Sequence, residues 1–196
     1  MDILTSFLLG TLYGISLAAP PGPILAMMAQ RTIISYLNGI SVGFGAMTAD
    51  FIFMIITLLF YGFIKNLPLF PFYIIGSLFM MFLIYSSLKS TKNEFKRGNE
   101  KSSNSYLLGL GIALVNPLQI GWWLTAGLTF ISLFGIISVV GFFTGIIIWV
   151  LFFAFIVRKG YSFNRGIASL AIKIFSIGTF FFFASYFMYI AIISLI

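Results

Sequence analysis

Long apolar segments separated by short polar ones fill almost the whole chain. A helix needs about 20 apolar residues to cross the hydrocarbon core of a bilayer, and six segments meet that length. Apolar residues are continuous within them and do not alternate with polar ones, which disfavours a transmembrane β-barrel. The pattern predicts an all-α polytopic membrane protein with helices near Ile3–Met28, Leu37–Ile64, Leu69–Lys89, Tyr106–Ser132, Phe134–Val157 and Ile167–Leu195.

Two stretches decide how these helices are divided. Ser90–Ser105 is too polar to enter lipid, and we interpret it as a solvated connector; binding of nucleic acid or anionic lipid by its basic residues has no other support. The fourth and fifth helices nearly touch around Ser132–Gly135, and five spans result if that junction is a re-entrant bend. We expect a single transmembrane domain, 1–196, with halves at about 1–89 and 106–196 and a connector at 90–105.

Composition supports a membrane protein and excludes several chemistries. Charged residues make up 8% of the chain, against roughly a quarter in soluble domains. The chain has no cysteine and no histidine, which removes disulfides, thiol chemistry and the usual ligands of zinc and copper. No nucleophile–base pair is visible. We therefore expect no enzyme, no catalytic residue, no metal site and no cofactor.

Lysine and arginine gather on one side of the predicted membrane plan, and only Lys65 lies on the other. The positive-inside rule then places the odd-numbered loops, including 90–105, in the cytoplasm and both termini outside. The first segment carries Asp2 and no basic residue, unlike the start of a signal peptide, so we expect a retained span. The basic residues on the cytoplasmic side are Arg31, Lys89, Lys92, Lys96, Arg97, Lys101, Arg158, Lys159, Arg165 and Lys173.

The first predicted span contains three prolines and a glycine, at Pro20, Pro21, Gly22 and Pro23. Proline removes a backbone donor and clashes with the preceding turn, and in lipid the freed carbonyl groups need other partners. A helix broken here must be buried against other helices or line a wet cavity. Transporters build substrate sites from such broken helices; a plain proline kink without a ligand is the alternative.

The two halves of the chain also resemble each other. Gly14–Pro20 and Gly111–Pro117 match at four of seven positions, half a chain apart, and each match ends on a proline inside the first helix of its half. A unit of three spans reverses its direction, so a duplicate inserts upside down. We therefore predict two inverted three-helix repeats, with the site at their interface.

Asp50 is the one acid in the middle of a predicted span. A carboxylate there costs on the order of 3 kcal/mol or more, so it should face the interior and have a partner. At 1.5 Å per residue, Pro20, Asn116 and Asp50 lie ~12, ~16 and ~19 Å from the cytoplasmic ends of their helices. Asp50 is a candidate counter-ion or proton-coupling group; a structural role, with hydrogen bonds from Thr48 or a neighbouring helix, is the alternative.

Three tryptophans and several glycine pairs have two interpretations each. Trp122, Trp123 and Trp149 lie within spans, where ring faces attract cations or simply pack between helices. Glycines spaced four apart let helix backbones approach closely, and we interpret them as packing or sliding surfaces. They are Gly10 and Gly14, Gly39 and Gly43, and Gly141 and Gly145.

These motifs together resemble the LysE family of amino-acid exporters over the whole chain. Pro21-Gly22-Pro23 is similar to the first-helix motif of the family, the spaced glycines before Asp50 to its second helix, and Asn116-Pro117 to its fourth. The third helix, from Gly76 to Lys89, also resembles its counterpart. Many members have lysine or asparagine where this chain has Leu118-Gln119, and tyrosine in place of Phe79.

The resemblance implies a secondary transporter in the cytoplasmic membrane of a prokaryote. It would export an amino acid, basic or small and neutral, driven by the proton gradient or the membrane potential. The substrate carboxylate would meet N–H groups near Gly22–Ala26, its ammonium Asp50, with Asn116 as a second polar contact. The candidate substrate-binding residues are Pro20, Pro21, Gly22, Pro23, Asp50, Asn116, Pro117, Trp122, Trp123 and Trp149.

Two other functions stay open at this point: a metal-cation exporter, and a membrane scaffold that transports nothing. The expected partners are a small-molecule amino-acid substrate and the lipid bilayer, without nucleic acid. Whether the protein forms a homodimer is left open.

Overall fold

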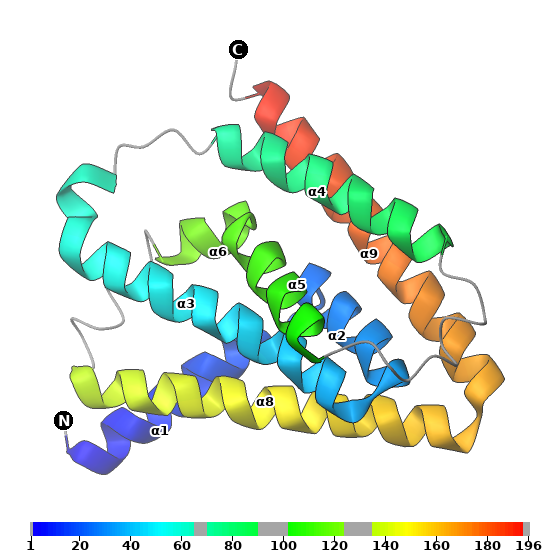
Figure 1. Ribbon diagram of the computed structural model, residues 1–196. Helices are drawn as coiled ribbons and strands as arrows, with labels where there is room; N and C mark the ends of the chain where they lie inside the picture. The colour runs from blue at the N-terminus through cyan, green and yellow to red at the C-terminus, as the bar shows by residue number, and fades with distance from the viewer. Residues whose placement is uncertain (1, 65–69, 90–101, 124–134, 194–196) are drawn as a thin grey trace.

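The computed structural model describes residues 2–64, 70–89, 102–123 and 135–193, and every element within them is an α-helix. The helices pack in pairs of distant segments: α1 lies along α8, α3 along α5, and α4 along α9 (Figure 1). Their bounds are α1 Ile3–Ala18, α2 Pro23–Ile34, α3 Tyr36–Ile64, α4 Phe70–Lys89, α5 Ser102–Leu114, α6 Pro117–Trp122, α8 Ile136–Phe163 and α9 Arg165–Ile193.

The first predicted span is broken at its prolines, as expected. α1 ends at Ala18, α2 begins at Pro23, and the two helices are bent by 80°. Pro23 occupies the first position of α2, where a missing N–H is not needed for helix bonding. The expected single helix Ile3–Met28 is thus wrong in its bounds: there are two helices, and the second continues to Ile34.

The expected break at Asn116-Pro117 is also confirmed. α5 ends at Leu114, and α6 begins at Pro117. The Asn116 side chain caps α6 by accepting a hydrogen bond from the Leu118 N–H at 3.1 Å, a common way to satisfy a helix start. Residues 124–134, which include the expected end of the fourth span and its junction with the fifth, lie outside the described residues.

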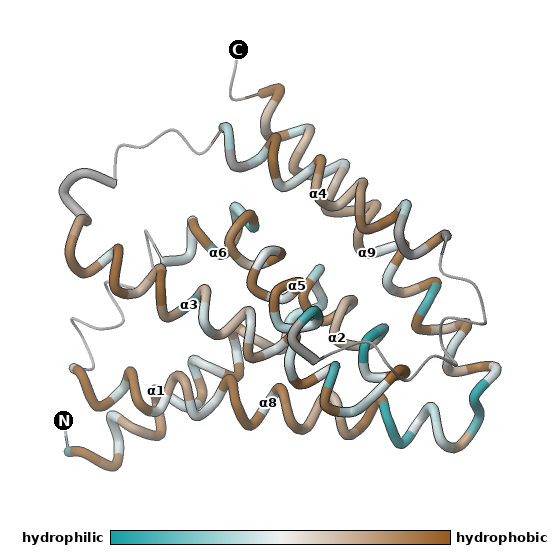
Figure 2. Tube along the Cα trace, viewed as in Figure 1, coloured by the Kyte–Doolittle hydropathy of each residue, from teal (hydrophilic) through white to brown (hydrophobic). Residues whose placement is uncertain are grey.

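In the described residues, three helices are long and apolar enough to cross a membrane: the Tyr36–Phe60 part of α3, α8 and α9. The bent pair α1 and α2 makes a fourth if it counts as one span. The six-span plan is therefore not confirmed. Apolar side chains that face outward along these helices form a surface suited to lipid, and Figure 2 shows the hydrophobic middle of the helices against more hydrophilic ends near the α8–α9 junction.

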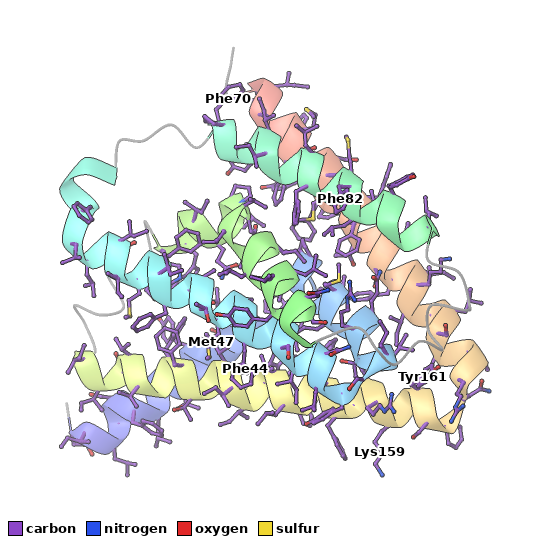
Figure 3. The ribbon with its side chains drawn as sticks, viewed as in Figure 1. Phe44, Met47, Phe70, Phe82, Lys159 and Tyr161 are labelled. Atoms are coloured by element: carbon purple, nitrogen blue, oxygen red, sulfur yellow. The ribbon has the colours of Figure 1, made fainter. Side chains whose placement is uncertain are left out.

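Several other bounds differ from the expected ones. α8 continues to Phe163, beyond the expected Val157, and so includes the charged Arg158 and Lys159. Lys159 projects away from the other helices (Figure 3), so its charge does not interrupt the helix. α5 begins at Ser102, inside the stretch expected to be a polar connector, and the rest of that connector, 90–101, lies outside the described residues.

Glycines let α1 and α8 approach backbone to backbone. A Cβ on Gly10 or Gly14 would collide with carbonyl groups of α8, and one on Gly141 or Gly145 would collide with carbonyl groups of α1. The expected close-packing role of these two pairs is confirmed. In the third pair, a Cβ on Gly39 would meet the Thr32 side chain and one on Gly43 the Val150 side chain.

The helix α2 is fixed at both ends by other helices. Ser176 of α9 donates a hydrogen bond to the Ala26 carbonyl at 3.0 Å, near the start of α2. Arg158 of α8 donates to the Ile33 carbonyl at 3.1 Å, at the end of α2, where a positive charge also suits the helix dipole. The start of α2 is therefore held in a defined place inside the molecule.

Candidate functional site

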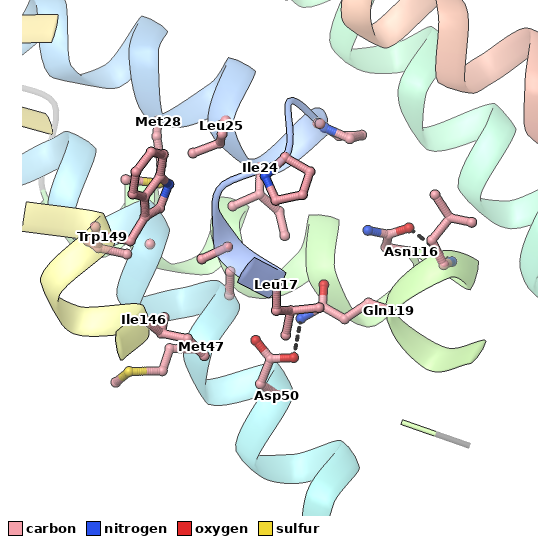
Figure 4. Close-up of a pocket in the computed structure, with 18 of the residues that line it drawn as sticks. Leu17, Ile24, Leu25, Met28, Met47, Asp50, Asn116, Gln119, Ile146 and Trp149 are labelled. Carbon is pink, nitrogen blue, oxygen red and sulfur yellow. Dashed lines mark hydrogen bonds between the residues drawn. The ribbon is translucent and has the colours of Figure 1, made fainter. Parts of the chain in front are cut away.

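An internal cavity of about 290 Å³ lies between the two helix breaks. Its walls come from the α1–α2 break, the middle of α3, the start of α6 and the middle of α8 (Figure 4). The lining residues are Leu17, Ala18, Pro20, Pro21, Gly22, Pro23, Ile24, Leu25, Met28, Gly43, Ala46, Met47, Asp50, Asn116, Leu118, Gln119, Trp122, Ile146, Trp149, Val150 and Phe183.

Asp50 is 5% exposed and accepts two hydrogen bonds from the segment that follows the second break. Gln119 Nε2 lies 2.7 Å and Trp123 Nε1 2.8 Å from the same oxygen, Oδ1. In Figure 4 the other carboxylate oxygen is turned away from Gln119. Within the described residues no group donates to that oxygen, Oδ2, so it is available to a ligand in the cavity.

The structural alternative for Asp50 is correct in one respect and wrong in another. The donors do come from a neighbouring helix, but Thr48 is not among them. Thr48 donates to the Phe44 carbonyl and accepts from the Tyr106 hydroxyl at 2.8 Å. Because both donors to Asp50 meet one oxygen, hydrogen bonding within the protein satisfies only half of the carboxylate.

The start of α2 faces the same cavity with unbonded backbone donors. Helix bonding begins where the Ala26 N–H meets the Gly22 carbonyl at 3.0 Å. The N–H groups of Ile24 and Leu25 come before it, and no side chain caps them because the capping position is Gly22. Such a helix start carries partial positive charge and binds anionic groups.

Two buried polar atoms in the cavity wall have no hydrogen-bond partner in the described structure: Gln119 Oε1 and Trp149 Nε1. Gln119 is 7% exposed. Its Nε2 must face Asp50, since two acceptors would repel each other, so its Oε1 is left over. Buried polar atoms normally have partners, so both atoms are candidates for a hydrogen bond to a bound ligand or to water.

Trp122 and Trp123 are held by an aromatic cluster around Phe142. Trp122 stacks on Phe142 at 5.5 Å between ring centroids, and Trp123 meets it edge to face at 5.6 Å. The packing interpretation is confirmed for Trp122, which also lines the cavity; attraction of a cation by its ring stays a prediction. Trp123 packs and bonds to Asp50 without lining the cavity.

The structure brings most of the expected site residues around this one cavity. Pro117 and Trp123 do not line it: Pro117 is buried at the start of α6, and Trp123 acts on Asp50 from behind. Asn116 lines it, but its Oδ1 is occupied by the cap on α6, which leaves its amide nitrogen for a ligand. The expected residues that do line it are Pro20, Pro21, Gly22, Pro23, Asp50, Asn116, Trp122 and Trp149.

Gln119 is the functional candidate that sequence reasoning missed. In the sequence it stands out only as part of Leu118-Gln119, where the resemblance leads one to expect lysine or asparagine after Asn116-Pro117. One signal was present: Gln119 and Trp123 are four residues apart, which places both side chains on one helix face. That spacing directly after a helix break indicates two donors aimed at one acceptor.

Comparisons with known proteins place the chain in a family. No curated protein and no solved structure matches it. A family model described as LysE type translocator matches residues 15–191, which span both helix breaks and every lining residue of the cavity. The chain therefore belongs to the LysE type translocator family.

Proposed function

We propose that this translocator is a secondary transporter that exports an amino acid across the cytoplasmic membrane of a prokaryote. One observation carries the proposal: the half-bonded carboxylate of Asp50 and the uncapped start of α2 line the same small cavity. An α-amino acid carries one ammonium and one carboxylate, and these two features complement them. The cavity lies near the small end of the ~300–1,000 Å³ range of ligand pockets.

The binding step follows from these contacts. The substrate ammonium donates to Asp50 Oδ2, and the substrate carboxylate accepts from the N–H groups of Ile24 and Leu25. Trp123 holds the Asp50 carboxylate from behind the cavity wall, and Gln119 holds it from within the wall. The ammonium also neutralises a buried charge, so release of substrate leaves Asp50 either to take up a proton or to stay charged. In the second case the net charge that moves couples transport to the membrane potential.

We further propose that transport uses two inverted three-helix repeats. A two-fold exchange of the halves takes α1 to α5, α3 to α8 and α4 to α9. It converts the α1–α8 pair into α5–α3 and leaves the α4–α9 pair unchanged, and all three pairings are present. The two helix breaks correspond in the same exchange. Rocking of one repeat against the other would then open the cavity to either side.

The geometry gives less support to the alternatives. A hard metal cation binds about six or more oxygen ligands. The described cavity wall offers one carboxylate. A scaffold that transports nothing has no need for a cavity with a buried carboxylate at the meeting point of two broken helices.

The test is counterflow in proteoliposomes. Purified protein is reconstituted, loaded with each of the common amino acids in turn, and assayed for uptake of the same labelled amino acid against protein-free liposomes. We expect accelerated exchange for at least one of them. Analogues lacking one charged end, an amino alcohol and an N-acetyl amino acid, should fail to exchange. Absence of exchange with every amino acid would exclude the proposed function and leave the metal-cation exporter and the scaffold.

A further inference from the structure

Among the described residues that line the cavity, Asp50 is the single charged side chain. Against it stands the partial positive charge at the start of α2, where Ile24 and Leu25 present uncapped N–H groups. These two features complement the two charged ends that all α-amino acids share. Amino acids with ionisable side chains carry a third charged group. The described lining side chains offer no opposite charge for it.

The ammonium and carboxylate that all α-amino acids share also give partners to the two unpartnered polar atoms, Gln119 Oε1 and Trp149 Nε1. Gln119 Oε1 is on the residue that donates to Asp50, so an ammonium at Asp50 Oδ2 has a second acceptor beside it. Trp149 Nε1 is a donor, and Figure 4 shows Trp149 next to Met28 and Leu25 of α2. It therefore joins the N–H groups of α2 as a partner for the substrate carboxylate.

Apart from Asn116 and Trp122, the other described side chains of the wall are apolar. They include flexible methionines, which adapt their shape to an apolar ligand. A cationic side chain in this space would stay without a counter-ion, an anionic one would be repelled by Asp50, and a hydroxyl would lose its hydrogen bonds to water. The apolar side chains are Leu17, Ile24, Leu25, Met28, Met47, Leu118, Ile146, Val150 and Phe183.

Resting on the proposed function, we propose that the substrate is an amino acid with a neutral, apolar side chain of the aliphatic or thioether kind. The cavity discriminates against lysine and arginine because Asp50 is already used by the α-ammonium. It discriminates against glutamate by charge repulsion and against serine by loss of hydrogen bonds. Selectivity thus comes from the lack of polar and charged partners for the substrate side chain. Affinity comes from Asp50, Gln119 and the start of α2.

Parallel counterflow assays with labelled leucine and labelled lysine test the inference, with leucine, isoleucine, methionine, lysine, arginine, glutamate and serine as unlabelled competitors. We expect the first three to compete at least about tenfold better than the others. Lysine or arginine exchanging as well as leucine would overturn the inference and leave the exporter proposal standing. If no amino acid exchanges, the exporter proposal fails first, and this inference fails with it.

A variant supplies the converse test. Met47 lines the cavity one helical turn before Asp50, so Met47→Glu adds the second acid that a cationic side chain lacks. We expect the ratio of lysine to leucine exchange to rise about tenfold or more. The matched control is Met47→Gln, which has similar size and polarity without the charge and should leave the ratio unchanged. Two outcomes contradict the inference. One is an equal rise of the lysine-to-leucine ratio in both variants, and the other is an unchanged ratio in both variants although both still exchange leucine.

Discussion

The indole Nε1 of Trp123 lies 2.8 Å from Asp50 Oδ1, and joins the residue that closes α6 to the buried carboxylate of α3. The Trp123 ring is itself fixed by edge-to-face contact with Phe142 of α8. Asp50, Trp123 and Phe142 thus form a chain of contacts that joins three segments. Trp123, which does not line the cavity, and Gln119, which does, together set the orientation of Asp50, so its second oxygen has a defined direction for a ligand.

Trp123→Phe removes this hydrogen bond and keeps an aromatic ring against Phe142. Loss of a hydrogen bond to a charged group should lower the free energy of unfolding by about 1.5–3 kcal/mol. Trp123 does not line the cavity, so we expect a raised KM for substrate with a smaller change in maximal rate. Thermal unfolding in detergent and counterflow kinetics measure the two effects.

A double-mutant cycle separates the bond from simple packing. In an Asp50→Asn background the Trp123→Phe substitution should cost clearly less stability, because the charged acceptor is gone. Equal costs in both backgrounds would show that Trp123 acts through packing alone.

Much of this fold was predictable because long apolar runs and prolines act locally. The bounds of α3 and α4 agree with the expected ones within a residue, and both breaks occur at the expected prolines. The 80° turn after α1 was not predictable. Proline removes a hydrogen bond but does not fix the direction in which the chain continues, which here follows from contacts of α2 with α8 and α9.

The candidate site shows the same division between local and long-range information. Asp50 stands out in the sequence because an acid in an apolar run is costly wherever it lies. Gln119 does not stand out, since a glutamine after Asn116-Pro117 has meaning only when its distance from Asp50 is known. The contact joins segments far apart in the chain, and it depends on how α6 packs against α3.

The backbone contact between α1 and α8 predicts a position-specific effect of alanine. Gly145→Ala places a Cβ against the Thr11 carbonyl, and we expect a loss of about 1–3 kcal/mol in stability from overpacking. Gly160→Ala on the same helix is the control, because a Cβ there meets nothing within 4 Å and should stabilise by up to about 1 kcal/mol. Melting temperatures in detergent compare the two. Similar shifts for both variants would argue against the close approach.

The distribution of basic residues predicts the orientation in the membrane. Because the chain has no cysteine, a single introduced cysteine reports without background. Asn93→Cys should be shielded from an impermeant thiol reagent in intact cells, and a cysteine added after Ile196 should be labelled. Permeabilised cells provide the control for Asn93→Cys. Labelling of that variant in intact cells would show that the orientation is the reverse of the expected one.

Asp50→Asn tests the carboxylate on which the proposed mechanism depends. The substitution is nearly isosteric and removes a costly buried charge, so folding and insertion should be retained. Export should be abolished or severely reduced, because the substrate ammonium loses its counter-ion. Asp2→Asn is the matched control: it makes the same change at an exposed acid before α1 and should leave export intact.

The same variant distinguishes two roles of Asp50. If the carboxylate only binds the ammonium, exchange and gradient-driven export should fall together in Asp50→Asn. If instead it carries the coupling proton and does not bind the ammonium, the variant should still exchange substrate between the two sides but fail to concentrate it, because asparagine does not take up and release a proton. Counterflow measures exchange, and uptake into liposomes with an imposed proton gradient measures concentration. Wild-type rates in both assays would show that the carboxylate serves only to hold Gln119 and Trp123, and the site would then lie elsewhere.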